Sequence, residues 1–217
     1  MYNILFIGNS YTYFNDMPTA MFKKIAEAAG YDVNVTSITK GGWTLGKHAD
    51  ANDECGGAVD AALANNKYDY VVIQEQSLRP AVSPELFFEG VRALVKKIRA
   101  NGAVPLLYST WGRKEGSAKL TELSLTNKTM TEKIADASRS IANELDIAVA
   151  YVGLAFYDVC NTNPCIELYN ADMSHPSESG SFLAALTIFS KMFDFDVTTL
   201  SFPMDESGVL SAAAKRK

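Results

Sequence analysis

The sequence predicts an α/β protein built on a parallel sheet of about five strands with helices on both faces. Short apolar runs alternate with segments of helical periodicity along most of the chain. The run Tyr70-Val71-Val72-Ile73 is continuously apolar, as a central parallel strand should be. We find no linker, repeat or low-complexity tract, and 217 residues suit one well-buried core, so a single domain over 1–217 is expected.

The individual elements follow from apolar spacing and from the residues that begin or end each segment. The first strand is predicted at Ile4-Leu5-Phe6-Ile7 and ends at Gly8. A helix capped by Asp16 is expected to continue to Gly30. The later predicted strands cover residues 33–38, 70–73, 104–108 and 147–152. The later predicted helices cover about 57–65, 84–101, 127–145 and the segment from Ser177 to Phe193. Polar or irregular stretches are expected over 47–57, 109–125 and 153–176, the last with a short helix near Phe156.

Composition and charge exclude several classes of protein. A net charge of −5 argues against a nucleic-acid or anionic-membrane binder. No apolar run approaches the roughly 20 residues that span a bilayer. The start MYNILFIG lacks a basic flank and a cleavage site, which predicts a cytoplasmic location. Cys55, Cys160 and Cys165 form no C-x-x-C motif, so we expect free thiols in a reducing compartment.

A serine and a histidine near opposite ends of the chain suggest nucleophilic chemistry. Ser10 follows the first strand, at the sheet edge where ligands bind in open parallel sheets. A serine hydroxyl needs a base, and His175 has Asp172 three residues before it to fix its tautomer. The competing interpretation is that Ser10 is a turn residue and that Asp172 and His175 cap the last helix. Polar residues at the matching strand ends favour the catalytic interpretation.

Four blocks of the sequence resemble those of the SGNH (GDSL-like) hydrolase superfamily. They are I-G-N-S-Y-T, G-G-W-T, Q-E-Q-S and D-M-S-H-P, and their order and spacing match from Ser10 to about Phe193. The resemblance implies an esterase or lipase on a flavodoxin-like three-layer α/β/α sandwich. It implies Ser10 as the nucleophile, His175 as the base and Asp172 as the residue that orients the base. The backbone N–H groups of Ser10 and Gly42 and a side-chain amide of the third block would form the oxyanion hole.

Two positions depart from the family pattern. Asn9 stands where the family usually has an aspartate before the serine, and this change does not touch the mechanism directly. The usual asparagine of the third block is absent, and Gln76 aligns best with it. Glutamine carries the same amide donors on a longer stem, so Gln76 is the expected oxyanion donor and Gln74 is the alternative.

Other functional classes agree less well with the sequence than a hydrolase does. The stretch from Gly41 to His48, G-G-W-T-L-G-K-H, nearly matches a P-loop, but His48 replaces the hydroxyl residue that binds Mg²⁺. A flavin-binding module suits the fold and the acidity, yet Tyr11-Thr12-Tyr13-Phe14 is bulky where a phosphate loop must be small. No cluster has metal-ligand spacing, so no cofactor or metal is expected. We interpret His48 as a solvated loop residue.

Aromatic residues in the strand-end loops bear on the substrate. Tyr11, Trp43 and Trp111 are expected to contact it, because aromatic rings in such loops can stack on sugars. The sequence shows no long apolar lid, which favours short acyl groups. We therefore predict a serine ester hydrolase that removes a short acyl group, acetyl foremost, from a carbohydrate-like or other small ester through an acyl-enzyme. The alternatives are a flavin-binding module and a non-catalytic scaffold, and the oligomeric state stays open.

Overall fold

The computed structural model describes residues 1–200, and the basic C-terminal stretch 201–217 lies outside the described residues. Within this range, five strands form one sheet in which every neighbouring pair is parallel. The strand order is β2-β1-β3-β4-β5, so the winding direction reverses between β1 and β3. The strands are β1 (Tyr2–Gly8), β2 (Val33–Thr39), β3 (Tyr70–Gln74), β4 (Val104–Ser109) and β5 (Ala148–Tyr151). The expected parallel α/β sheet is confirmed.

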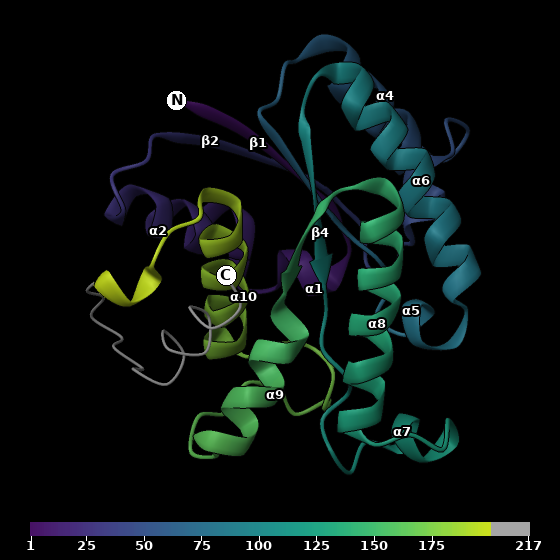
Figure 1. Cartoon of the computed structure of the whole chain (residues 1–217), viewed down its shortest axis with the longest axis vertical. Coiled ribbons are helices and arrows are strands. Elements are labelled where there is room, and N and C mark those ends of the chain that lie inside the picture. The colour runs from purple at the N-terminus through teal and green to yellow at the C-terminus, as the bar shows by residue number, and fades with distance from the viewer. Residues whose placement is uncertain (201–217) are drawn as a thin grey trace.

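Helices cover both faces of the sheet (Figure 1). Side chains on successive strand positions point to opposite faces, so Ile4 and Phe6 of β1 join one core while Leu5 and Ile7 join the other. The first core contains residues of α2 (Lys23–Ala28), α9 (Val152–Thr162) and α10 (Glu178–Phe193). The second contains residues of α4 (Glu54–Asn65), α6 (Pro84–Asn101) and α8 (Asn127–Leu145). Burial on both faces explains why the central strands are apolar throughout.

Several helix ends agree with the sequence prediction. The bounds of α8 are those expected, and Thr126 precedes it with a capping box to Thr129. Ser177 caps α10 by accepting a hydrogen bond from the Gly180 N–H at 3.1 Å. Gly102 ends α6 with a φ of 91°, a left-handed conformation that suits glycine. Among the described residues, no helix is long and apolar enough to cross a bilayer.

Three expectations for the connecting segments are wrong. The loop expected over 47–57 begins inside a helix, α3 (Leu45–Ala49), which Thr44 caps. The stretch 153–176, expected to be irregular apart from a short helix near Phe156, instead starts with the eleven-residue helix α9, which includes Phe156. Asp16 does not cap a helix to Gly30, because its φ is 50° and its side chain makes no capping bond. That region is instead divided into α1 (Ser10–Tyr13), a 3-10 turn (Phe14–Asp16), a π-helical segment (Met17–Phe22) and α2.

Candidate active site

The strand order brings three loops together at the carboxyl edge of the sheet. Because β1 lies between β2 and β3, Ser10 is flanked by the loop that carries Gly42 and by the loop that carries Gln76. A cavity of about 220 Å³ opens at this point. Its lining comes from the loops after four strands and from the segment before α10: Asn9, Ser10, Tyr11, Gly42, Gln76, Ser77, Arg113, Ser174 and His175.

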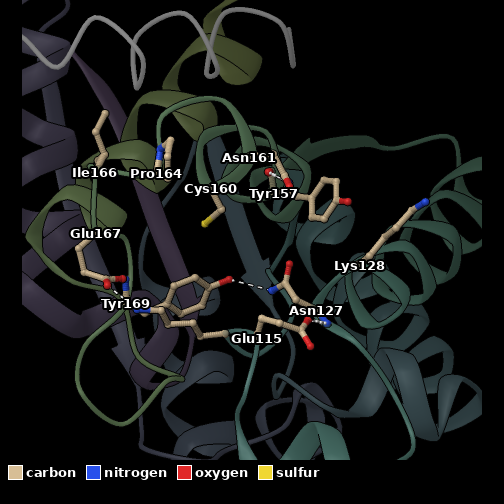
Figure 2. Close-up of a pocket in the computed structure, with 11 residues that line it drawn as sticks. Glu115, Asn127, Lys128, Tyr157, Cys160, Asn161, Pro164, Ile166, Glu167 and Tyr169 are labelled. Atoms are coloured by element: carbon tan, nitrogen blue, oxygen red, sulfur yellow. Dashed lines mark hydrogen bonds and ion pairs between the residues drawn. The ribbon is translucent and has the colours of Figure 1, made fainter.

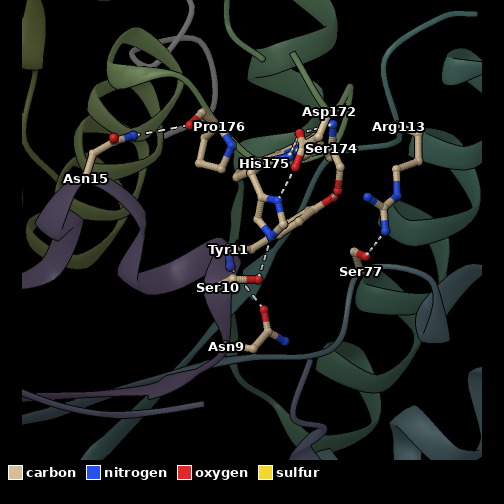
Figure 3. Close-up of polar contacts among 11 residues, drawn as sticks. Asn9, Ser10, Tyr11, Asn15, Ser77, Arg113, Asp172, Ser174, His175 and Pro176 are labelled. Atoms are coloured by element: carbon tan, nitrogen blue, oxygen red, sulfur yellow. Dashed lines mark hydrogen bonds and ion pairs between the residues drawn. The ribbon is translucent and has the colours of Figure 1, made fainter. Parts of the chain in front are cut away.

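Ser10, His175 and Asp172 form one continuous chain of hydrogen bonds (Figure 3). The Ser10 Oγ lies 2.8 Å from His175 Nε2, and His175 Nδ1 lies 2.5 Å from Asp172 Oδ2. Burial raises the pKa of Asp172, but hydrogen bonds from the His175 ring and from the backbone outweigh it and hold that pKa below its usual value. The carboxylate is therefore ionised, and it favours the tautomer in which Nε2 can accept the serine proton.

Asn9 ties the nucleophile loop to its neighbours. Its side-chain oxygen accepts a hydrogen bond from the Tyr11 N–H at 3.1 Å, which caps the short helix that Ser10 begins. Its side-chain nitrogen donates to the Trp43 carbonyl at 2.9 Å, and its backbone N–H donates to Gln74 Oε1 at 2.9 Å. The loops after β1, β2 and β3 are thus fixed to one another beside Ser10.

The segment after Ser10 also holds the histidine. The Phe14 ring stacks on the His175 ring with centroids 4.2 Å apart and an 8° angle between the planes. Asn15 donates to the carbonyls of Pro176 and Ser177 at 3.2 and 3.0 Å. Phe14 does not line the cavity with Ser10 but packs against His175. The nucleophile and the base are therefore positioned by the same stretch of chain.

The two glutamines of the third block have different surroundings. Gln74 is 0% exposed, and its Oε1 accepts hydrogen bonds from the Asn9 N–H and the Thr12 hydroxyl, while its Nε2 donates to the Glu75 carbonyl. Gln74 is thus fully buried and does not line the cavity, so the structure does not support its alternative assignment as oxyanion donor.

Gln76 lies in the lining of the cavity instead. Its Oε1 accepts hydrogen bonds from the N–H groups of Leu78 and Arg79 at 3.0 and 3.2 Å, which fixes the orientation of the amide. Gly42, with a φ of 72°, lines the same cavity. Within residues 1–200, neither the Ser10 N–H nor the Gly42 N–H donates a hydrogen bond to another residue. These donors remain available to a ligand.

The predicted substrate contact of Trp111 is wrong. Its side chain is 0% exposed and lies between the rings of Tyr11 and Phe156, with centroid distances of 4.6 and 4.0 Å. Its indole N–H donates to the Ser174 carbonyl at 3.0 Å. Both ring faces are covered, so Trp111 packs against Tyr11 in the core next to the cavity and is not open to a ligand. Tyr11 is also largely buried but lines the cavity, and its hydroxyl lies 2.9 Å from Ser174 Oγ.

Trp43 is engaged by charged side chains of its own region. Its indole N–H donates to Asp53 Oδ1 at 2.8 Å. The ammonium groups of Lys40 and Lys47 lie 4.0 and 3.9 Å from its ring centroid. Trp43 is not among the residues that line the cavity with Ser10, so its predicted substrate contact gains no support from the geometry.

His48 is not a solvated loop residue, and that interpretation is wrong. It lies in α3, is fully buried, and donates from Nε2 to the Gly8 carbonyl at 2.9 Å. Leu45 and His48 are three residues apart, so both face inward from the short helix. Burial lowers the pKa of His48, which keeps the ring neutral. Its contact is with backbone at the end of β1, which indicates a structural role.

Two ionisable residues at the site were missed by the sequence reasoning. Arg113 lines the cavity and donates from Nη2 to Ser77 Oγ at 3.2 Å. Glu75 is 3% exposed and accepts hydrogen bonds from the N–H groups of Gln76 and Leu45 at 2.6 and 3.2 Å. Burial raises the pKa of Glu75 to about 7. The sequence offered only their positions as a signal. Glu75 stands just after the predicted strand 70–73, and Arg113 lies in the loop after the predicted strand 104–108.

A second cavity, of about 360 Å³, lies between the start of α8, α9 and the loop that follows α9 (Figure 2). The Tyr169 hydroxyl donates to the Gly112 carbonyl at 3.0 Å and accepts from Asn127 at 3.1 Å. Its candidate nucleophile is Cys160, but burial raises the pKa of this thiol, which keeps it protonated. The hydrogen-bonded chain of Ser10, His175 and Asp172 lies at the other, Ser10 cavity.

Comparisons with known proteins place the chain in a family. No family model matches the sequence, and no curated protein is significantly similar to it. Among solved structures, a protein from Slackia heliotrinireducens assigned to the SGNH hydrolases is 36% identical and has a TM-score of 0.77. The match covers 88% of this chain and 98% of that chain. This chain belongs to the SGNH hydrolases.

More distant structures share the fold of this SGNH hydrolase. A DUF4886 family protein from Bacteroides uniformis has a TM-score of 0.84 at 20% identity, covering 99% of this chain and 93% of that one. A variant of an acetylxylan esterase from Geobacillus stearothermophilus has a TM-score of 0.63 at 16% identity, covering 87% and 94%. The expected family and three-layer fold are confirmed, and family membership favours a hydrolase over a flavin-binding module.

Proposed function

We propose that this SGNH hydrolase is a carboxylic ester hydrolase whose catalytic triad is Ser10, His175 and Asp172. The observation that carries the proposal is the unbroken hydrogen-bonded chain from Ser10 Oγ through both ring nitrogens of His175 to Asp172, with spacings of 2.8 and 2.5 Å. Proton transfer needs donor and acceptor within about 2.6–3.2 Å, and the serine–histidine distance meets this requirement.

The reaction divides into two acyl transfers. Ser10 Oγ attacks the ester carbonyl carbon as its proton passes to His175 Nε2, giving a tetrahedral oxyanion. The carbon–oxygen bond to the alcohol then breaks, and His175 returns the proton to the departing oxygen. A water attacks the resulting acyl-enzyme while His175 takes one of its protons. Collapse of the second intermediate releases the carboxylic acid and restores the Ser10 hydroxyl. Asp172 stabilises the charged imidazole in both halves.

The oxyanion would be held by donors from three loops. They are the N–H groups of Ser10 and Gly42 and the side-chain amide of Gln76, all on residues that line the cavity. Donors fixed in advance stabilise the negative charge that develops on the carbonyl oxygen, because they need no reorganisation during the reaction. The backbone bonds that orient the Gln76 amide support this assignment.

The size and lining of the cavity bear on the substrate. A cavity of about 220 Å³ suits a short acyl group such as acetyl. The polar residues Ser77, Ser174 and Gln76 are among those that line it, which favours a polar alcohol, such as a carbohydrate, over a lipid. The similarity in fold to an acetylxylan esterase is consistent with this substrate class.

The central test is hydrolysis of 4-nitrophenyl acetate, followed by acetate release from a panel of acetylated sugars. Ser10→Ala should lower kcat by about 10⁴-fold or more and should abolish labelling by a fluorophosphonate. Ser37→Ala, on an exposed position of β2, is the matched control and should retain both. Wild-type turnover in the Ser10 variant would refute the nucleophile. A wild type that neither hydrolyses esters nor reacts with the probe would favour the non-catalytic scaffold.

A further inference from the structure

The Ser10 cavity contains a cation that has no carboxylate partner. Arg113 lines the cavity together with Ser10 and His175. In the described part of the chain, no Asp or Glu oxygen lies within 4.0 Å of its guanidinium. Partly buried charges in folded proteins are normally paired, because removing them from water is costly otherwise. An unpaired guanidinium beside a nucleophile therefore needs an explanation.

The contacts that Arg113 does make leave most of its donors unused. Nη2 donates to Ser77 Oγ at 3.2 Å, and the guanidinium carbon lies 5.8 Å from the centre of the Tyr11 ring. Its Nε is buried and has no hydrogen-bond partner. Figure 3 shows the guanidinium and Ser77 beside the triad. Ser77 and the aromatic ring hold the group in place without neutralising it.

We propose that Arg113 forms an anion-binding subsite and that the substrate of this hydrolase is an ester carrying a carboxylate. The inference rests on the proposed ester hydrolase function and adds the charge of the substrate to it. A guanidinium presents a planar fork of N–H donors that matches a carboxylate in a bidentate arrangement. No Asp or Glu lines the cavity with Arg113, and the carboxylate of Asp172 is hydrogen-bonded to His175 and not to Arg113.

The carboxylate can belong to either half of the ester, and matched substrates separate the two sources. For the alcohol side, 4-acetoxybenzoate is compared with its neutral methyl ester by release of the phenol. For the acyl side, monomethyl succinate is compared with dimethyl succinate by release of methanol. The measured quantity is the ratio of kcat/KM for the anionic ester to that for the neutral ester, in wild type and in each variant. Comparing this ratio in a variant with the same ratio in the wild type cancels the intrinsic difference in reactivity between the two esters.

We expect Arg113→Met to lower this ratio by about 10- to 100-fold in one of the two arms, as for the loss of a hydrogen bond to a charged group. Arg113→Lys keeps the charge but lacks the planar fork of donors, so its ratio should lie between those of the wild type and Arg113→Met. Lys114→Met is the matched control, since it removes an adjacent cation that pairs with Glu167 outside this cavity. Its ratio should equal that of the wild type.

A measurement on the wild type covers the case in which the variant does not fold. Benzoate should inhibit hydrolysis of 4-nitrophenyl acetate competitively and at least tenfold more strongly than benzamide, with the difference reduced by salt. Equal inhibition by the two compounds, with no preference for the anionic ester in either arm, would overturn the subsite. An equal loss on anionic and neutral esters in Arg113→Met would overturn it as well. Neither result affects the triad, which is tested separately by Ser10→Ala on the neutral ester.

Discussion

The buried carboxyl of Glu75 should make the stability of this protein decrease as pH rises. Glu75 is the first residue after β3, and it is 3% exposed. One oxygen accepts hydrogen bonds from the N–H groups of Leu45 and Gln76, whereas Oε2 is buried without a partner. Removal from water disfavours the charged form, and this burial raises the pKa from 4.5 to about 7. The proton is therefore held more tightly in the folded state than in the unfolded state.

The sign and size of the effect follow from this difference in pKa. Below pH 4.5 both states carry the proton, so Glu75 does not contribute to the pH dependence. Between pH 4.5 and about 7 the unfolded state releases its proton first, and the free energy of unfolding falls as pH rises. Above pH 7 both states are ionised and the full loss, about 3 kcal/mol, is present. Glu75→Gln removes the ionisation and keeps an oxygen for the two N–H donors.

Urea unfolding of wild type and Glu75→Gln at pH 4.5, 5.5, 7 and 8 provides the test. The variant should gain stability relative to wild type as pH rises, by about 3 kcal/mol between the extremes. The test uses the difference in the free energy of unfolding between the two proteins, because other groups titrate in both. Glu89→Gln, at an exposed position of α6, is the matched control and should give a difference that is small at every pH. If the difference between wild type and Glu75→Gln does not change with pH, the argument from burial is refuted.

Three further substitutions separate catalytic from structural roles. Gln76→Ala should lower kcat on 4-nitrophenyl acetate by about 10²–10³-fold with little change in KM, and an effect mainly on KM would make it a substrate contact. Trp111→Ala should reduce the free energy of unfolding by about 3–5 kcal/mol in urea, and full stability with a raised KM would contradict its burial. His48→Leu removes the shorter of two hydrogen bonds to the Gly8 carbonyl, which keeps only the Lys40 N–H at 3.3 Å, and should destabilise by about 0.5–1.5 kcal/mol while most turnover remains. A loss of turnover equal to that of His175→Ala, in a folded protein, would contradict its structural role.

The fold could be predicted from the sequence because its signals are local. The four apolar residues from Ile4 to Ile7 must be buried, and a strand with neighbours on both sides of the sheet is the simplest way to bury them. The 127–145 segment has an apolar stripe at helical spacing and became α8 with the same bounds. Short elements were missed where spacing gives little information, as with α3, which has only five residues.

The pairing of Asp172 with His175 was also accessible to sequence reasoning, because they are three positions apart and one turn brings them together. The contact of His175 with Ser10 spans 165 positions and depends on how α10 packs against the sheet. The sequence supported that contact only indirectly, through polar residues at the matching strand ends and through the family resemblance.

Burial and charge pairing at the site were decided by the tertiary structure alone. Trp111 and His48 were interpreted as exposed because both stand in or near polar stretches, yet both are fully buried by residues distant in the sequence. The choice between Gln74 and Gln76 depended on whether the side chain faces the core or the cavity, which the length of β3 determines. The sequence by itself therefore determined the strands, the main helices and the pairing of Asp172 with His175, since each rests on short-range spacing. Solvent access, hydrogen-bond partners and the unpaired charge of Arg113 were set by tertiary packing, because they depend on which distant groups surround each side chain.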